Sequence, residues 1–442
     1  MKRLSWLVAA LCGGLLAAAC AREPDAGNFL PDLDRIDEDY DQIDSLGAYD
    51  RLGYRLFVAN RDLQASELYV QAAYLYHEAG KLDSVPFLLN RAIDAGMANP
   101  KILEKFQGLR PDPGEADWNR LLQRLDSIGE RLGEVDHFEL RMEAMQAFWP
   151  YLERALADTS KAREALQEFI FKGPRELRDY YVVRYYSLDN MYGQMINGSP
   201  AYYSYLKRHF NPDSLESLKA LTRSWMGRFK EIYPQAVFPN VYVVPGILNS
   251  GGTLTEMGLF VGGDLYGAGP DAPVEELTDW QRGALQPFSD MPGIALHELM
   301  HFQQNYRDSL NRETVMQKVV DEGVCDFLVE LVSGRPNRDS RLAYLQDSVN
   351  RKGILADLRR ELLSEDLTLW MYNGNSITDR PPDLGYTIGY LVCKSYYERQ
   401  SDKRAAVYRL LNTDDIREIW AGSDYAFLLP DTGTGKEFES LP

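Results

Sequence analysis

The sequence predicts an α+β protein that is mostly helical, with one small sheet near the middle of the chain. Apolar residues recur at helical spacing from Leu52 to about Ile128, and again through most of the chain after Leu132. Runs rich in β-branched and aromatic residues occur only at 237–244 and 257–262. Because the chain has 442 residues, of which 45% are hydrophobic, it can form more than one core.

Charge and cysteine content exclude two classes of protein. The formal net charge of −18 leaves the chain without the basic surface that supplies most nucleic-acid affinity, so no nucleic-acid partner is expected. Its four cysteines are too few for a disulfide-stapled scaffold, and they form no CxxC pair of the kind that holds structural zinc. Cys325 and Cys393 either pair in an oxidising compartment or remain buried thiols.

Residues 1–19 have the anatomy of a signal peptide. Lys2 and Arg3 precede the apolar run 6–19, which is shorter than the roughly 18 residues that a membrane-spanning helix needs. Three alanines stand directly before Cys20, and the segment resembles a bacterial lipoprotein signal. This resemblance implies a lipid anchor at Cys20 and a place in the bacterial outer membrane or cell envelope, facing the periplasm or the cell surface. The alternative is an ordinary secretory signal with an incidental cysteine.

Two segments follow the signal. Residues 20–45 are acidic and turn-rich, and we expect them to form a tether. Residues 46–128 are expected to form a helical domain, within which residues 71–100 resemble a single tetratricopeptide-type hairpin with Gly80 at its turn. One such repeat cannot bury its own face, so neighbouring helices must cover it. The domain is either a spacer or a groove for a protein partner.

The second domain is predicted over residues 132–436, after the turn-rich segment 110–114. The runs 237–244 and 257–262 are expected to pair as strands, with the turn-rich residues 246–256 between them. Before the strands come tyrosine-rich helices, in which we expect core side chains rather than a sugar-binding or peptide-binding surface. These tyrosines are Tyr180, Tyr181, Tyr185, Tyr186, Tyr192, Tyr202, Tyr203 and Tyr205.

One helix carries the chemistry that the sequence suggests. In the run IALHELMHF, His297 and His301 are four residues apart, so on a helix they share a face and can bind one zinc ion. Glu298 is offset from His297 by about 100°, so it lies beside the ion and can take a proton from the attacking water. The residues between the histidines are otherwise uncharged, as for a helix buried beneath a metal. A histidine six residues after His301 would complete a metzincin site, but Arg307 stands there.

A second amphipathic helix is predicted at 315–332, and it offers a third ligand. Glu322 and Asp326 are four residues apart on one face. Glu322 can complete the site, and Asp326 can accept the remaining N–H of a ligating histidine. Asp321 and Glu330 remain competitors for the third ligand. The alternative is that these acids are the solvated face of a core helix.

The two motifs together resemble those of the gluzincin metallopeptidases. HELMH is followed some twenty residues later by DEGVCDF, which matches the pattern HExxH and then EGxxD. A wider likeness over about residues 135–400 is to a bacterial group of predicted zinc-dependent peptidases that includes gliding-motility-associated lipoproteins. The resemblance implies a zincin-like metallopeptidase domain, with Cys325 where many relatives carry alanine. It implies the following roles: His297, His301 and Glu322 as ligands of Zn²⁺, Glu298 as general base, and Asp326 as the partner of a ligating histidine.

Two further elements of a cleft are expected. The resemblance implies that the strand containing Gly258, Leu259, Phe260 and Val261 lies along the cleft, where an extended peptide would add to it. Near the end of the chain, Tyr386 and Tyr390 lie on one helical face beside Gly385 and Gly389, and Gly323 is expected to let two helices approach. A phenol near the metal can donate to a developing oxyanion, and Tyr386 is the preferred candidate. The alternative is a pair of core tyrosines. Arg380 is a further candidate charge in the cleft.

These expectations combine into one function and one alternative. The predicted function is zinc-dependent hydrolysis of peptide bonds by a lipid-anchored protein of the bacterial envelope, with a peptide or protein as substrate. The alternative is a catalytically inactive zincin-like lipoprotein that has a structural role or binds a partner through its N-terminal helices.

Overall fold

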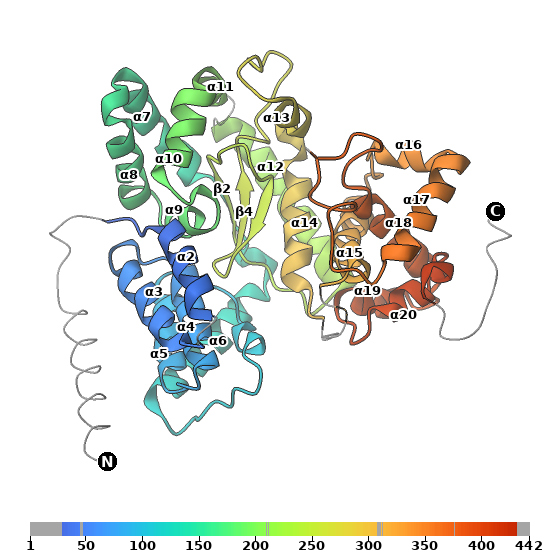
Figure 1. Ribbon diagram of the computed structural model, residues 1–442, viewed down its shortest axis with the longest axis horizontal. Helices are drawn as coiled ribbons and strands as arrows, with labels where there is room; N and C mark the ends of the chain where they lie inside the picture. The colour runs from blue at the N-terminus through green and yellow to red at the C-terminus, as the bar shows by residue number, and fades with distance from the viewer. Residues whose placement is uncertain are drawn as a thin grey trace.

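The computed structural model is mostly helical with one small sheet, so the predicted α+β class is confirmed (Figure 1). It describes residues 29–44, 47–208, 210, 212–306, 311, 313–374 and 376–430. The predicted signal peptide and Cys20 lie outside these residues. Within them, no helix combines the length and the apolar character needed to cross a membrane.

The N-terminal region is a group of helices, as the sequence predicts. The two helices of the predicted hairpin, α4 and α5, pack side by side, and Gly80 between them has a φ of 69°, a conformation that glycine adopts without strain. The neighbouring helices α3 and α6 cover this hairpin, as a single repeat requires. The elements of the region are α2 (Leu33–Asp44), α3 (Tyr49–Leu63), α4 (Ser66–Glu78), α5 (Ser84–Asp94), η1 (Ile102–Lys105) and α6 (Ala116–Leu132).

Part of the segment predicted to be a tether is folded. Helix α2 packs on α3, Leu33 is buried, and the Tyr181 hydroxyl lies 3.5 Å from the carbonyl oxygen of Pro31. Leu30, Leu33 and Ile36 are spaced three apart and so form an apolar stripe within an acidic sequence. The tether prediction is therefore wrong for residues 29–44, because this short stripe outweighs the acidic composition.

The sheet has four strands in the order β1-β2-β4-β3. The strand β2 pairs in parallel with both β1 and β4, whereas β3 pairs antiparallel with β4 and forms one edge. Both predicted strands are present as β2 and β4, but β3 lies in the segment expected to be only a link. The strands are β1 (Leu140–Arg141), β2 (Val241–Val244), β3 (Gly252–Leu254) and β4 (Leu259–Gly262).

Helices surround the sheet. In Figure 1, α7, α8, α10 and α11 lie on one side of β2 and β4, and α14 runs along the other side, with α15 to α20 beyond it. Five of the eight tyrosines named above, Tyr180, Tyr185, Tyr202, Tyr203 and Tyr205, are at most 2% exposed, as expected for core residues. The elements before the sheet are α7 (Glu143–Ala157), α8 (Ala162–Lys172), α9 (Glu176–Tyr180), the π-helix η4 (Tyr181–Tyr185), α10 (Leu188–Met191), η5 (Tyr192–Gly198), α11 (Pro200–Leu206) and α12 (Pro212–Ile232). Those after it are α13 (Asp279–Ala284), α14 (Met291–Gln303), α15 (Val315–Ser333), α16 (Arg341–Gln346), α17 (Ser348–Glu361), α18 (Leu384–Arg399), α19 (Lys403–Leu411) and α20 (Arg417–Ala421).

Helices α15 and α18 touch backbone to backbone. A Cβ atom on Gly323 would lie 2.0 Å from the carbonyl carbon of Gly389, and one on Gly389 would lie 1.9 Å from the carbonyl oxygen of Val319. The prediction that Gly323 lets two helices approach is confirmed. This contact fixes the position of α15, and with it the acids beside Gly323.

Candidate metal centre

Two crossing helices bring the predicted metal ligands together. Helix α14 has Pro292 in its first turn, where a proline is tolerated, and it carries His297 and His301 on one face. Helix α15 is capped by Thr314, whose hydroxyl accepts a hydrogen bond from the Gln317 N–H, and it presents Glu322 to both histidines. The site therefore depends on how these two helices pack.

Three ligand atoms form an equilateral triangle. The Nε2 atoms of His297 and His301 are 3.2 Å apart, and each lies 3.2 Å from Oε2 of Glu322. Atoms bound tetrahedrally at about 2.1 Å to a metal ion such as zinc lie about 3.4 Å from one another. The triangle thus matches one face of a metal tetrahedron, and it leaves the fourth position open.

The outer ring nitrogens of both histidines face acceptors. Nδ1 of His297 lies 3.0 Å from Oδ1 of Asp326, and Nδ1 of His301 lies 3.0 Å from Oε1 of Gln304. The Gln304 amide is oriented by its own Nε2, which donates to the carbonyl oxygen of Asp321 at 2.6 Å. In the neutral ring, a proton on each Nδ1 satisfies these acceptors and leaves a lone pair on each Nε2. The two Nε2 lone pairs and the Glu322 oxygen then point at one another and repel. A cation or added protons between them would remove this repulsion. Asp326 lies where the sequence predicts it.

The electrostatics of the three predicted ligands His297, His301 and Glu322, called the triad below, favour positive charge at their centre. Burial opposes ionisation of His297, but its contacts with Asp326 and Glu322 outweigh burial and raise its pKa well above the ordinary value. Burial likewise opposes ionisation of His301, whose pKa the Glu322 carboxylate raises. Burial alone would raise the pKa of Glu322, yet the two histidines hold it below its ordinary range. The surroundings of the three groups thus stabilise a bound cation.

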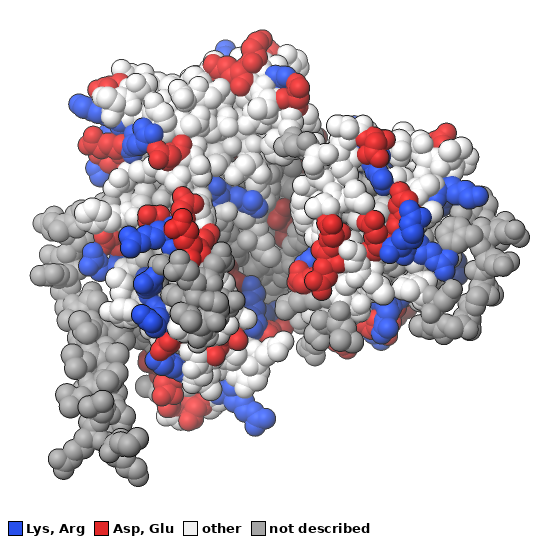
Figure 2. All heavy atoms as spheres, viewed as in Figure 1, with Lys and Arg blue, Asp and Glu red and all other residues white. Residues whose placement is uncertain are grey.

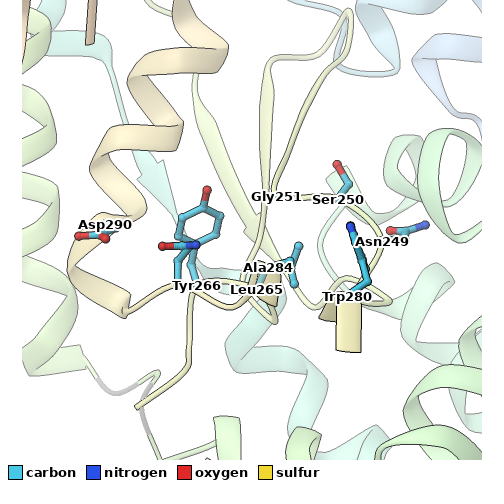
Figure 3. A pocket seen from close by; sticks show the side chains of 9 residues that line it. Asn249, Ser250, Gly251, Leu265, Tyr266, Trp280, Ala284 and Asp290 are labelled. Carbon is cyan, nitrogen blue, oxygen red and sulfur yellow. The ribbon is translucent and has the colours of Figure 1, made fainter. Parts of the chain in front are cut away.

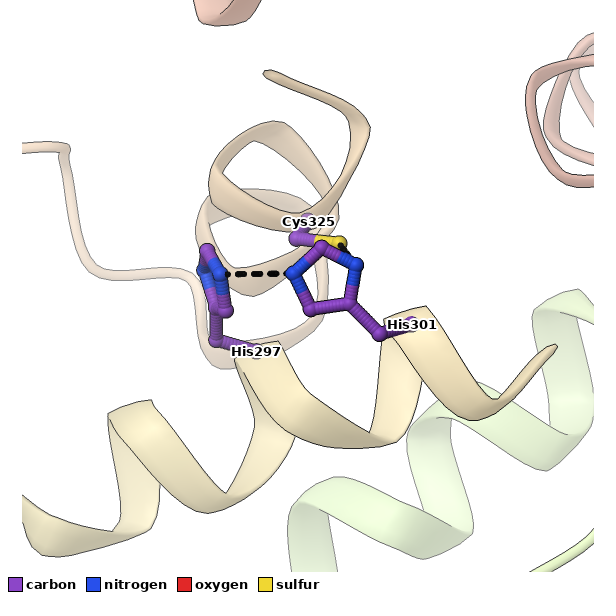
Figure 4. A group of neighbouring side chains, drawn as sticks. All are labelled: His297, His301 and Cys325. Atoms are coloured by element: carbon purple, nitrogen blue, oxygen red, sulfur yellow. Dashed lines mark hydrogen bonds between the residues drawn. The ribbon is translucent and has the colours of Figure 1, made fainter. Parts of the chain in front are cut away.

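Cys325 lies close to the same histidines. One ligand atom each of His297, His301 and Cys325 lies within 4.8 Å of the others (Figure 4). However, Sγ of Cys325 is 3.4 Å from Nδ1 of His301, on the edge of the ring away from the lone pair of Nε2. Burial and the nearby acids raise the pKa of the Cys325 thiol well above its usual value, whereas a metal binds the thiolate. Glu322 therefore fits the third position better than Cys325. Both Cys325 and Cys393 are buried and free.

The competing carboxylates have other partners. Glu330 accepts hydrogen bonds from the Tyr390 hydroxyl at 2.7 Å and from Lys394 Nζ at 2.6 Å. Asp321 accepts from the side-chain amide of Gln317. The structure thus joins Glu322 to the histidines, and it gives these two acids other roles.

The predicted general base lies against the edge strand. Glu298 is 8% exposed, and burial raises the pKa of its carboxyl group. A Cβ atom built on Gly252 of β3 would lie 2.1 Å from Oε1 of Glu298. Only glycine leaves room for this carboxylate at the strand. Gly252 was not among the predicted site residues, although the Gly251-Gly252 pair marks a place where another group comes close.

A tyrosine that the sequence analysis missed reaches the triad. The hydroxyl of Tyr372 lies 3.3 Å from Oε1 of Glu322, while the residue as a whole is 66% exposed. Its φ is 58°, in the left-handed region that residues other than glycine seldom adopt and that is enriched at functional sites. Tyr386 packs edge-on against Tyr372, with ring centres 6.2 Å apart, and burial and the nearby Glu322 carboxylate raise the pKa of its hydroxyl. The Asn-Gly dipeptide after Tyr372 signals a turn, but no pattern indicates where that turn places the ring.

The other two candidates from this region have partners outside the triad. Tyr390 donates to Glu330, as described above. The Arg380 guanidinium lies over the ring of Trp370 and 3.4 Å from Asp357. Neither residue has a described contact with the histidines or with Glu322.

The predicted substrate strand is an interior strand. Gly258 precedes β4, which contains Leu259, Phe260 and Val261 and is hydrogen-bonded to β2 on one side and β3 on the other. A peptide therefore cannot add to β4, and the prediction for this strand is wrong; the edge of the sheet beside Glu298 is β3. Gly262 N–H bonds to Gly251 and Thr255 N–H bonds to Gly258. Antiparallel alternation then turns the backbone groups of Gly252 and Leu254 away from β4.

Two cavities lie near the two ends of β3. One has a volume of about 400 Å³ and is lined by Asn249, Ser250, Gly251, Tyr266 and Trp280, with Asp290 at the start of α14 (Figure 3). The other has a volume of about 520 Å³ and includes Leu254 and His301 in its lining. In the view of Figure 2 the surface is hollowed over β4 and α14, between the N-terminal half of the chain and the C-terminal helices. The strand β3 thus runs from the first cavity, lined by Gly251, to the second, which is lined by Leu254 and by His301 of the triad.

Comparison of the chain with protein-family models, curated proteins and solved structures finds no match. Membership of the gluzincins therefore stays a prediction that depends on the two motifs.

Proposed function

We propose that the chain is a zinc-dependent peptidase with a zincin-like, gluzincin-type site. The observation that carries this proposal is the triangle of His297 Nε2, His301 Nε2 and Glu322 Oε2, with sides of 3.2 Å. Two imidazoles and one carboxylate, with an open fourth position, are the ligand set of a catalytic rather than a structural zinc site. The outer contacts of both histidines fix the tautomer that such a site needs.

The residues around the triad have distinct roles in this proposal. Zinc, when bound, polarises the carbonyl group of a peptide and makes water a better nucleophile at neutral pH. Glu298 accepts the proton of the attacking water and passes it to the leaving amine. Burial raises the pKa of Glu298, so this carboxyl group is a better base than an exposed one. Tyr372 takes the role expected of Tyr386, because its hydroxyl is the one beside Glu322.

The edge strand aligns the substrate. The outward N–H of Gly252 and the outward backbone groups of Leu254 pair with an extended peptide, which then passes over Glu298. The Gly252 carbonyl oxygen already accepts hydrogen bonds from the hydroxyls of Ser250 at 2.6 Å and Thr253 at 2.8 Å. A lipid anchor at Cys20 would hold this enzyme in the bacterial envelope, facing the periplasm or the cell surface. The signal-like N-terminus and the net charge of −18, which gives no attraction to anionic lipids, support acyl chains as the means of attachment.

Hydrolysis of a diverse peptide mixture by the purified, zinc-loaded chain tests the proposal. Mass spectrometry should detect new peptide termini with the wild-type protein. Glu298→Gln should lower the rate about a hundredfold or more while keeping the metal, since Glu298 is not a ligand. Equal cleavage by wild type and Glu298→Gln would contradict the role of the base. Stoichiometric zinc without cleavage by the wild type would support the inactive lipoprotein instead.

A further inference from the structure

The turn between β3 and β4 is inserted into the N-terminal helical region. Glu256, in this turn, accepts a hydrogen bond from the Ala98 N–H at 2.7 Å through its carbonyl oxygen, and one from Asn99 Nδ2 at 2.7 Å through its carboxylate. Its own N–H donates to Oε1 of Glu67 at 2.5 Å, and Lys105 forms an ion pair with its carboxylate. Four contacts thus join one residue of the turn to the helical region.

The next residue of the turn packs equally closely. Met257 is 3% exposed, and its methyl group would lie 2.4 Å from a Cβ atom on Gly96, which has a φ of 112°. Only glycine fits at this position, both for its backbone conformation and for the space that Met257 occupies. The helical region therefore holds the end of the edge strand in place.

The same region forms one wall of the larger cavity. Lys101 and Glu104, around η1, line it from the helical region, and Leu254 lines it from the end of β3. His301, Gln317 and Asp321 line it from α14 and α15. Leu254 is 40% exposed there although it is apolar. The lining of the cavity thus extends from the predicted metal ligand His301 to the N-terminal helical region.

A buried acceptor on the α15 side of this cavity has no partner. Gln317 is 2% exposed, and its amide nitrogen donates to Asp321, but its Oε1 has no hydrogen-bond partner among the described residues. A buried, unpaired amide oxygen is costly unless a donor reaches it. Of the three lysines that line the cavity, Lys105 pairs with Glu256 and Lys318 with Glu313, and Lys101 on the helical side forms no ion pair among the described residues. The α15 side of the cavity therefore offers an acceptor oxygen and the Asp321 carboxylate to a ligand.

We propose, resting on the peptidase function above, that this cavity is a specificity subsite for a cationic side chain of the substrate, with the helical region as one wall. Lysine and arginine carry only donors at their tips, which suits the Gln317 oxygen and the Asp321 carboxylate. The apolar stem of either side chain can lie along the exposed part of Leu254. The net charge of −18 also draws basic peptides rather than acidic ones. The N-terminal helices are then part of the substrate site and not a spacer.

Direct binding to the full-length Glu298→Gln chain tests this subsite without relying on turnover. Fluorescence anisotropy compares extended peptides that are identical except for one residue, which is lysine, norleucine or glutamate, placed at each position in turn. At one position we expect lysine to bind at least tenfold more tightly than norleucine, and glutamate to bind more weakly than both. Gln317→Leu should remove most of this preference. Gln123→Leu, an exposed change on α6, should leave it intact.

A second variant tests the subsite independently, in case Gln317→Leu does not fold. Glu104→Lys changes only a surface charge of the helical wall, and it should weaken binding of the lysine peptide several-fold more than binding of the norleucine peptide. Equal binding of lysine and norleucine at every position, or an unchanged preference in Glu104→Lys and in folded Gln317→Leu, would overturn the subsite. If the wild type neither binds zinc nor cleaves peptides, the peptidase proposal fails, and the binding comparison still decides on the cavity.

Discussion

Replacement of Gly252 by alanine tests the close approach between the edge strand and the general base. The added Cβ atom would lie 2.1 Å from Oε1, 2.5 Å from Cδ and 2.6 Å from Cγ of Glu298. Ordinary van der Waals contact begins at 3.4 Å, so the carboxylate must move by about 1.3 Å. Gly252 has no positive φ that would strain alanine, so the effect falls on Glu298 rather than on the backbone.

Such a displacement has a predictable size in catalysis. Misplacement of a catalytic group by about 1 Å costs on the order of a hundredfold in rate. We therefore expect Gly252→Ala to lower kcat/KM about a hundredfold on any peptide that the wild type cleaves. The zinc content and the unfolding temperature should change little, because Glu298 is not a ligand. Steady-state kinetics, metal analysis and thermal unfolding measure these three quantities.

Gly251→Ala is the matched control. Its Cβ atom would meet the ring and hydroxyl of Tyr266 at 3.3 Å, which a small shift relieves. This variant should keep most of the activity. If Gly252→Ala retained the wild-type kcat/KM, the placement of Glu298 against β3 as the base would be refuted.

Three other perturbations test the surroundings of the site. Asp326→Asn weakens the acceptor 3.0 Å from Nδ1 of His297, so zinc affinity measured against a chelating dye should fall about 10- to 100-fold, and an unchanged affinity would contradict the contact. Gly323→Ala places a Cβ atom 2.0 Å from the backbone of Gly389, so urea unfolding should show a loss of about 1–3 kcal/mol or more, whereas wild-type stability would refute the backbone contact. Desolvation raises the pKa of Glu67 from 4.5 to about 8 in the folded chain. Between pH 4.5 and 8 the native state then binds more protons than the unfolded state, so the unfolding temperature should fall as the pH rises from 5 to 8. Glu67→Gln should reduce this fall. An equal fall in the variant would contradict the raised pKa of Glu67.

The sequence was most informative where residue spacing alone places two side chains on the same face of a helix. His297 and His301 share a face on any helix, and Glu322 and Asp326 share a face of the next one, so each pair could be predicted from spacing alone. The choice of Glu322 over Asp321 required the resemblance, because both acids lie on the same predicted helix. The packing of Gly323 against α18 settles which of them turns toward the histidines.

The edge of the sheet could not be predicted in the same way. β3 has only three residues, of which one is glycine, so no alternation of apolar and polar residues marks it as a strand. Leu259, Phe260 and Val261 have a strong strand pattern because they are buried in the sheet, and such burial argues against an edge position. Tyr372 was missed for a related reason, since its position depends on a loop with a left-handed backbone rather than on a periodic element.

Metal analysis of ligand variants tests the central claim most directly. Elemental analysis of the purified full-length chain should find about one zinc per wild-type molecule. Glu322→Ala should lose this zinc, whereas Glu330→Ala and Cys325→Ser should retain it, because Glu330 binds Lys394 and Tyr390 and Cys325 lies on the other edge of His301. Loss of zinc from Cys325→Ser with retention in Glu322→Ala would contradict the proposed triad.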